Sequence, residues 1–352
     1  MNYKQSLFFI GKCLTMNHEV HNKDFIQKKL RDKSIDWKSI VKVSTAHYVL
    51  PALYCKLKQA NFLEYLPKDL VAFMEHITHL NRERNIKIIE QALKINNLLI
   101  KNGIKPIFIK GTGNLIEGLY DDIAERMTGD IDFIVAKNEY QKTIDILKND
   151  GYHRTEKNLI GFHKHYPRLI KENSIAAIEI HKDFFDTNFA RKFNYETIKD
   201  AIQKNGLVHV LSFQHQFYLT ILAYQINDHG YELKSISLRS AYDTFLLSKK
   251  IAPNALTPRF GKKTNTIIYC YLALVNHIFN NISSLNVLET KKNKIYVERF
   301  NKSFFYPQKK QSLINFVEKR NRQKYLLNLM IKALYRKKYT LYVFKKTIEK
   351  FR

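Results

Sequence analysis

The sequence of 352 residues predicts an α+β fold, with a small mixed or antiparallel sheet flanked by helices and with helical regions at both ends. Three patterns support this prediction. Residues 105–135 have the pattern of a strand, a glycine turn, a helix and a second strand. Residues 162–183 have the pattern of two antiparallel strands joined by a turn. Apolar residues recur at helical spacing on either side of these stretches, so the strands are expected in the middle of the chain.

The N-terminal region, residues 1–103, is predicted to be helical and to pack on the sheet-bearing part of the chain. Its longest helix is expected from Pro67 to about Lys101, where apolar residues follow the i, i+3, i+4 pattern. Gly103 suits the left-handed cap that ends such a helix. Because this helix leads directly into the first strand, we expect it to pack against the sheet. His47, in an earlier helical stretch, is expected to be a packing residue rather than a ligand.

The central region, residues 104–200, contains the most informative stretch, Lys105–Val135. A short apolar strand is followed there by the turn Lys110–Gly113 and then by helical spacing. Along the second strand, Asp130 and Asp132 point to one face and the apolar residues beside them to the other. Two carboxylates about 7 Å apart on one face, at the start of a strand, predict a site for a hard cation rather than part of a core.

The rest of the central region predicts an amphipathic helix over residues 137–149 and a further strand within Ser174–Asp183. On that strand Glu179 and His181 share one face, and two isoleucines share the other. An acid and a histidine on one strand face fit a cleft better than a core, although a solvated sheet face is the alternative.

The C-terminal region, residues 201–352, is predicted to be helical again. The helical pattern begins at Leu211 and runs to Lys250. The tail, residues 309–352, holds fourteen lysines and arginines and only two acids. Its leucines, methionine and isoleucine fall on one side, which predicts an amphipathic basic helix rather than a disordered arm.

Composition limits the possible partners. Lysine and arginine exceed aspartate and glutamate by 59 − 32 = 27. Such a charge favours polyanions as partners: nucleic acid, nucleotide phosphates or an anionic membrane face. A general lysine-rich bias of the sequence is the alternative explanation. The three cysteines show no metal-binding spacing, and the longest strongly apolar run is far shorter than the roughly 18 residues that span a bilayer. We therefore expect a cytoplasmic protein.

The ordered motifs of the central region resemble a known superfamily. Lys110-Gly111, a helix, Arg126, the run Gly129–Asp132 and then Glu-Ile-His at 179–181 are similar to the polymerase-beta-like nucleotidyltransferases. More narrowly, the chain resembles a branch of uncharacterised bacterial nucleotidyltransferases that has Lys-Gly where better-known members have Gly-Ser. The likeness continues more weakly through Leu211–Leu247, which looks like a helical cap beside the active cleft. It implies Mg²⁺-dependent transfer of a nucleoside monophosphate from a nucleoside triphosphate to a hydroxyl acceptor, which is a small molecule, a protein or RNA.

The resemblance also implies roles for individual residues. Asp130, Asp132 and Glu179 are expected to be catalytic and to bind two Mg²⁺ ions, with Asp183 as the alternative third ligand. Glycines and a helix N-terminus favour close approach of phosphates, and a lysine adds a point charge. The residues expected to contact the nucleotide are Lys110, Gly111, Thr112, Arg126, Gly129 and His181.

Several alternatives remain open at this stage. Lys110 is alternatively an exposed residue at a plain strand-to-helix turn, and Arg126 is alternatively in a buried ion pair with Asp121 or Asp122. The protein as a whole is alternatively an RNA-binding or interaction module on a catalytically decayed fold. Its basic tail suits RNA, such as a tRNA 3′ end, or an anionic membrane surface. The intact set of three carboxylates favours the enzyme.

Overall fold

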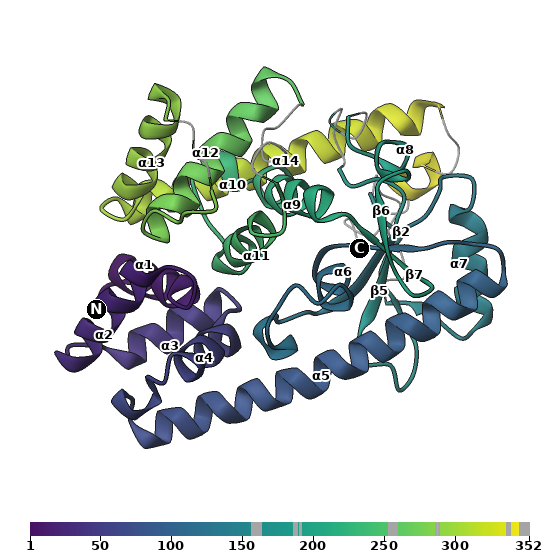
Figure 1. Cartoon of the computed structure of the whole chain (residues 1–352). Coiled ribbons are helices and arrows are strands. Elements are labelled where there is room, and N and C mark those ends of the chain that lie inside the picture. The colour runs from purple at the N-terminus through teal and green to yellow at the C-terminus, as the bar shows by residue number, and fades with distance from the viewer. Residues whose placement is uncertain are drawn as a thin grey trace.

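The computed structural model describes residues 1–155, 164–185, 189, 192–252, 260–285, 287, 289–335 and 339–344. In this part of the chain a mixed sheet of seven strands is flanked by helices, and both the N-terminal and the C-terminal regions are helical (Figure 1). The predicted α+β class is therefore confirmed.

The N-terminal helices lie at one end of a single long helix that runs on to the sheet (Figure 1), and their buried apolar residues share one core with those of the helices after the sheet. That helix, α5, runs over Lys68–Lys101, and Gly103 follows it with a φ of +77°, so the predicted helix and its left-handed end are confirmed. The helices before it are α1 (Tyr3–Thr15), α2 (Val20–Arg31), α3 (Trp37–Ala46), α4 (Leu50–Gln59) and the short 3₁₀-helix Leu63–Tyr65.

The sheet has the strand order β3-β4-β5-β2-β1-β7-β6. Its two parallel pairs are β2 with β5 and β1 with β7, and the other neighbours are antiparallel. The strand predicted over residues 162–170 is short, because β4 holds only its last two residues; residues 156–163 lie outside the described part. The strands are β1 (Ile107–Phe108), β2 (Asp130–Ile134), β3 (His153–Arg154), β4 (Leu169–Ile170), β5 (Ala177–His181), β6 (Ile202–Asn205) and β7 (Val208–Leu211).

The hairpin of β6 and β7 extends the sheet beyond residue 200. The prediction that a helical pattern begins at Leu211 is wrong, because Leu211 ends β7 and helix α9 begins at Phe213. The hairpin was missed because β6 is an edge strand of largely polar, half-exposed or exposed residues, and such a strand carries no apolar alternation. The three-part division of the chain stays a prediction.

The two faces of the sheet pack against different layers. One face is covered by the C-terminal half of α5 and by α7 (Tyr140–Asn149), whose Ile95 and Leu147 belong to one cluster with Phe133 and Ile178. The opposite face carries the acidic residues of β2 and faces the helices that follow the sheet. The sheet therefore buries an apolar face under α5 and leaves its polar face to line a cleft.

The helices that follow β5 in the chain form the upper layer of Figure 1. They are α8 (Tyr195–Ile198), α9 (Phe213–Leu222), the π-helix Ala223–Asn227, α10 (Gly230–Leu233), α11 (Leu238–Ser248), α12 (Lys262–Ile278), α13 (Lys291–Ser303) and α14 (Pro307–Tyr335). The tail is helical through Tyr335, as predicted. Its apolar side is exposed, with only Val317 and Leu329 buried in α14. Among the described helices, none combines the length and the hydropathy needed to cross a bilayer.

Candidate active site

The pairing of β2 with β5 builds the centre of the candidate site. The two strands run parallel, with Asp132 beside Glu179 and Asp130 beside Ala177. Side chains on neighbouring strands in such register point to the same face, so the acids of β2 meet the acid and the histidine of β5. The alternation predicted for both strands is confirmed, because Ile131 and Ile178 are fully buried on the opposite face.

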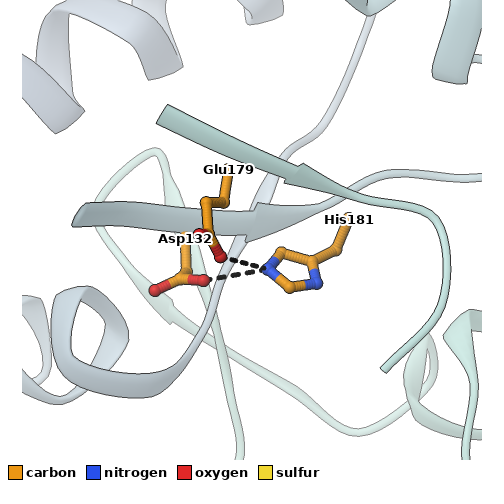
Figure 2. Close-up of side chains that lie close together, drawn as sticks. All are labelled: Asp132, Glu179 and His181. Atoms are coloured by element: carbon orange, nitrogen blue, oxygen red, sulfur yellow. Dashed lines mark hydrogen bonds and ion pairs between the residues drawn. The ribbon is translucent and has the colours of Figure 1, made fainter. Parts of the chain in front are cut away.

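Three side chains converge at this point (Figure 2). The imidazole Nε2 of His181 lies 2.8 Å from Asp132 Oδ1 and 3.6 Å from Glu179 Oε2. All three residues are buried, and one ligand atom from each lies within 4.8 Å of the others. Two carboxylate oxygens and an imidazole nitrogen gathered this closely are a donor set suited to a divalent cation.

The ammonium group of Lys110 lies among these three side chains. Its Nζ is 2.5 Å from Asp132 Oδ1, 3.6 Å from Glu179 Oε2 and 3.4 Å from His181 Nε2. Burial alone would lower the pKa of Lys110, but the charges of Asp132 and Glu179 outweigh it and raise that pKa. Lys110 thus supplies a positive charge at the point where the carboxylates converge.

The backbone at Lys110 is held in an unusual conformation. Helix α6 (Lys110–Ile116) begins at this lysine, with a φ of +53°, so the predicted turn over Lys110–Gly113 is wrong; these residues form the first turn of the helix. The side chain of Gln216 on α9 accepts a hydrogen bond from the Lys110 amide at 3.1 Å and donates one to its carbonyl at 3.4 Å. A left-handed lysine costs conformational energy, and this buried clamp holds it. Sequence reasoning missed Gln216, because it lies 106 residues away.

Arg168 joins the two outer carboxylates. Its Nη2 lies 2.8 Å from Asp130 Oδ2, and its Nε lies 3.0 Å from Glu179 Oε1. This arginine, just before β4, was not among the predicted site residues. Its position just before a strand of only two residues left no periodicity by which to place it. Arg168 and Lys110 together offset much of the negative charge of the three acids.

The two outer carboxyl groups respond differently to this environment. Burial raises the pKa of Asp130, and the charge of Arg168 offsets only part of that effect. Burial also acts to raise the pKa of Glu179, but the hydrogen bond from His181 and the charge of Lys110 outweigh it and hold that pKa well below its usual range. Burial lowers the pKa of His165, whose Nε2 lies 3.7 Å from Glu179 Oε2. Glu179 is therefore ionised at neutral pH.

The other predicted nucleotide contacts have distinct positions. The hydroxyl of Thr112 is buried and donates a hydrogen bond to the Asp130 carbonyl at 3.0 Å, which ties α6 to the start of β2. A Cβ atom on Gly111 would lie 3.0 Å from the Thr128 hydroxyl, so this position favours glycine. At Gly129 a Cβ atom would meet nothing within 4 Å, so the backbone there borders open space.

Arg126 is held by an acid from the C-terminal helices. Its Nε donates a hydrogen bond to Asp243 Oδ2 at 2.9 Å, and the pair is almost fully buried. Asp121 and Asp122, considered as partners from the sequence, pair instead with Lys56 and Arg82. The alternative that Arg126 forms a buried ion pair is therefore confirmed, but its partner is Asp243 rather than Asp121 or Asp122. This pair joins α11 to the loop before β2.

These residues line one cleft with a volume of about 640 Å³. Asp130, Asp132 and Glu179 form part of its wall, and Arg239, Ser240 and Asp243 of α11 form another part. Asp183 is absent from the described lining, and its Oδ1 pairs with Lys137 Nζ at 3.1 Å. The described lining also includes Lys110, Gly111, Arg126, Gly129, Arg84, Lys164 and Arg168.

Comparison with known proteins agrees with this geometry. The model of a family described as uncharacterised nucleotidyltransferases matches residues 33–280, which is more than two thirds of the chain. The chain belongs to this family. The match includes the whole sheet, the convergent carboxylates and the α11 wall of the cleft. No curated protein and no solved structure matches the chain. The predicted resemblance to nucleotidyltransferases is confirmed.

Proposed function

We propose that the protein is an Mg²⁺-dependent nucleotidyltransferase that moves a nucleoside monophosphate from a nucleoside triphosphate, such as ATP, to a hydroxyl acceptor. The observation that carries the proposal is the convergence of Asp132, Glu179 and His181 in a nucleotidyltransferase-family chain, with both carboxylates at the wall of an open cleft. Adjacent buried carboxylates are costly unless cations accompany them, and a divalent cation would add to the charge that Lys110 and Arg168 supply.

The residues present fit a divalent cation. The ammonium of Lys110 is within 3.6 Å of a ligand atom on each member of the group, so the site already accommodates positive charge. Asp132 and Glu179 would hold the ion, with Asp130 completing a second position beside Asp132, which supports two ions. When bound, such ions neutralise phosphate oxygens and increase the acidity of the acceptor hydroxyl.

The chain's own residues supply orientation and charge. Lys110 lies at the start of α6, where its ammonium can contact a phosphate once a cation takes its place beside Asp132. Arg168 holds Asp130 and Glu179 in position through its two hydrogen bonds. His181 directs Asp132 through the bond to Oδ1. Nucleotidyl transfer needs little covalent chemistry from the protein, so this positioning is its main contribution.

Among the three classes of acceptor, the surface charge favours RNA. The formal net charge is +27, and the described basic residues of α14 lie on a largely exposed helix. Each phosphate neutralised by such a surface releases counterions, so affinity for RNA would fall steeply as salt rises. Binding of a short single-stranded RNA at 50 and 200 mM salt tests this part of the proposal. An affinity that does not change with salt would favour a small-molecule or protein acceptor.

The proposed reaction is tested with triphosphates labelled on the α-phosphate. The full chain is incubated with each of the four labelled nucleotides, Mg²⁺ and total cell extract, and the labelled product is isolated and identified. Label transfer is expected with the parent chain and is expected to be absent with Asp132→Asn. If no nucleotide labels any component while the chain still binds divalent cations, the module on a decayed fold is the better description.

A further inference from the structure

Three arginines surround the loop that leads into β2. The loop, Arg126–Gly129, uses its carbonyl groups as acceptors for all three. Arg126 and Arg239 both donate to the Met127 carbonyl, at 2.7 and 3.1 Å. Arg84 on α5 donates to the Thr128 and Gly129 carbonyls, both at 3.4 Å. Side chains from α5, from α11 and from the loop itself therefore place guanidinium groups along the loop that precedes Asp130.

Only one of these arginines has an acidic partner in the described part of the chain. Arg126 is paired with Asp243, whereas neither Arg84 nor Arg239 forms an ion pair with any described residue. The Nε of Arg239 is buried and has no hydrogen-bond partner there. A buried donor without an acceptor is costly, and such groups in folded proteins usually mark a missing ligand or water.

The guanidinium groups of Arg126 and Arg239 also repel each other. Arg126 is the main cause that lowers the pKa of Arg239 to about 10, with burial adding to the effect. The guanidinium of Arg239 lies 5.0 Å from the centre of the Tyr48 ring, a distance typical of cation–π contacts. An anion bound between Arg84 and Arg239 would relieve the repulsion and give the Nε of Arg239 an acceptor.

The position of these arginines identifies the anion's class. They line the same cleft as Asp130, Asp132 and Glu179, together with the hydroxyls of Thr220 and Ser240. A volume of about 640 Å³ falls within the roughly 300–1,000 Å³ typical of small-ligand pockets. Space beside the Gly129 backbone leaves the loop open to a ligand. A cleft with carboxylates on one wall and unpaired guanidinium groups on another suits a ligand that carries several phosphates next to a metal.

We propose that Arg84 and Arg239 form a polyphosphate subsite that binds the terminal phosphates of the nucleoside triphosphate. This inference rests on the proposed function and adds two residues that the sequence motifs did not indicate as nucleotide contacts. Guanidinium groups bind phosphate through paired N–H donors, which lysines cannot reproduce. Because Arg239 belongs to α11 and Arg84 to α5, the subsite uses the helical regions on both sides of the sheet.

The experiment is isothermal titration of the full chain with inorganic tripolyphosphate in the presence of EDTA, so that no metal contributes. Arg239→Gln and Arg84→Gln are each expected to weaken binding on the order of tenfold, which is the scale for losing a hydrogen bond to a charged group. Arg239→Lys is expected to recover only part of the loss. Lys87→Gln is the matched control, because Lys87 is an exposed cation on α5 outside the described lining of the cleft.

The ligand series separates the terminal phosphates from other anions. The arginine variants should weaken ATP and tripolyphosphate by similar factors and should leave AMP unchanged. Equal weakening of AMP, or an effect of Lys87→Gln as large as that of Arg84→Gln, would overturn the subsite. Tighter binding of single-stranded RNA than of tripolyphosphate, with the same loss in both variants, would assign these arginines to nucleic acid instead. Circular dichroism melting establishes whether each variant is folded. If Arg239→Gln does not fold, Arg84→Gln alone tests the subsite.

Failure of the subsite is distinguishable from failure of the proposed reaction. If Asp132→Asn abolishes transfer while both arginine variants bind tripolyphosphate normally, the reaction stands and the subsite is wrong. If the arginine variants lose tripolyphosphate binding while no nucleotide is transferred by the parent chain, the subsite stands and the proposed reaction is wrong.

Discussion

Two lysines of this protein each lie between two carboxylates, and their surroundings differ. Lys56 Nζ is 2.8 Å from Asp121 and 2.9 Å from Glu125, and its side chain is 0% exposed. Lys110 Nζ contacts Asp132 and Glu179, and its side chain is 28% exposed at the wall of a cleft. A lysine between two carboxylates is thus enclosed with Glu125 in one place, where only Asp121 reaches solvent, and is an accessible charged group in the other.

The difference lies in what surrounds each group. The Glu125 carboxylate also accepts a hydrogen bond from the buried hydroxyl of Tyr242, so this network is satisfied within the protein. Around Lys110 the backbone is left-handed, and His181 keeps an Nδ1 without a described partner. Satisfied and enclosed ion pairs stabilise a fold, whereas strained and open ones occur at functional sites. The comparison therefore predicts opposite consequences for changes at the two clusters.

The largest effect is expected at the centre of the open cluster. Asp132→Asn should reduce nucleotidyl transfer on the order of 10³-fold, because the carboxylate proposed to be shared by both metal ions loses its charge. Asp130→Asn should also abolish transfer. Rates with labelled triphosphate at saturating Mg²⁺ measure the loss, and melting temperature measures folding. Asp145→Asn, an exposed acid on α7, is the matched control. Full activity of Asp132→Asn or Asp130→Asn at saturating Mg²⁺ would contradict the assignment of these acids as metal ligands.

The closed cluster should instead respond in stability. Lys56→Met leaves Asp121 and Glu125 without their cation, and breaking a buried pair in this way costs about 3–5 kcal/mol. Urea unfolding of the variant measures the change. Lys58→Met is its control, because Lys58 lies on the same helix with its side chain 61% exposed. Unfolding midpoints that are equal in both variants would remove the distinction between the two clusters.

The same substitution at the open cluster sharpens the comparison. Lys110→Met is expected to change the urea midpoint far less than Lys56→Met and to tighten binding of Mn²⁺ alone, because the ammonium no longer competes for Asp132. Triphosphate affinity should fall at the same time, since a phosphate contact is lost. Titrations with Mn²⁺ and with ATP measure the two effects separately. A loss of Mn²⁺ affinity would mean that Lys110 holds the carboxylates in position for the ion rather than competing with the ion for Asp132.

Glu179 provides a smaller effect with a specific kinetic form. Glu179→Gln should lower the rate of transfer on the order of 10²-fold while changing triphosphate affinity little, because its charge acts mainly in the transition state. Single-turnover rates and nucleotide titrations separate these quantities. Asp183→Asn is the comparison, since Asp183 was the alternative third ligand and pairs with Lys137 outside the cluster. A large loss in Asp183→Asn with none in Glu179→Gln would reverse the assignment.

How far the sequence could predict this arrangement depended on the range of the interactions. Alternation along β2 and β5 predicted which side chains share a face, because that pattern is local and has a period of two. The pairing of Asp132 with Glu179 needed only that the two strands be neighbours. The left-handed start of α6 was beyond local patterns, since Gln216 holds it from another helix.

The arginines were harder to assign for a related reason. An arginine is equally compatible with an exposed surface, an ion pair and a ligand contact, and only its neighbours distinguish these roles. Arg126 and Arg239 differ in this way: one has Asp243, and the other has a carbonyl and an aromatic ring. No spacing in the sequence separates the two cases. The edge strand β6 escaped prediction because its four largely polar residues show no apolar alternation.

The smallest expected effect concerns the contact between the N-terminal helices and α11. His47 accepts a hydrogen bond from the Leu238 amide at Nδ1 and contacts the Tyr3 hydroxyl through Nε2, which requires the neutral ring. Burial, the largest cause, lowers the pKa of His47 to about 4, while the unfolded chain titrates near 6.5. Between these values the unfolded state binds more protons, so this histidine's contribution to stability is present above pH 6.5 and is lost as pH falls toward 4.

His47→Gln keeps an acceptor for the amide and does not titrate, so its urea midpoint should fall less between pH 7 and pH 5 than that of the parent chain. His79→Gln, at an exposed position of α5, should leave the dependence unchanged. Equal pH dependence in the parent and in His47→Gln would show that the contact with Leu238 does not require the neutral ring.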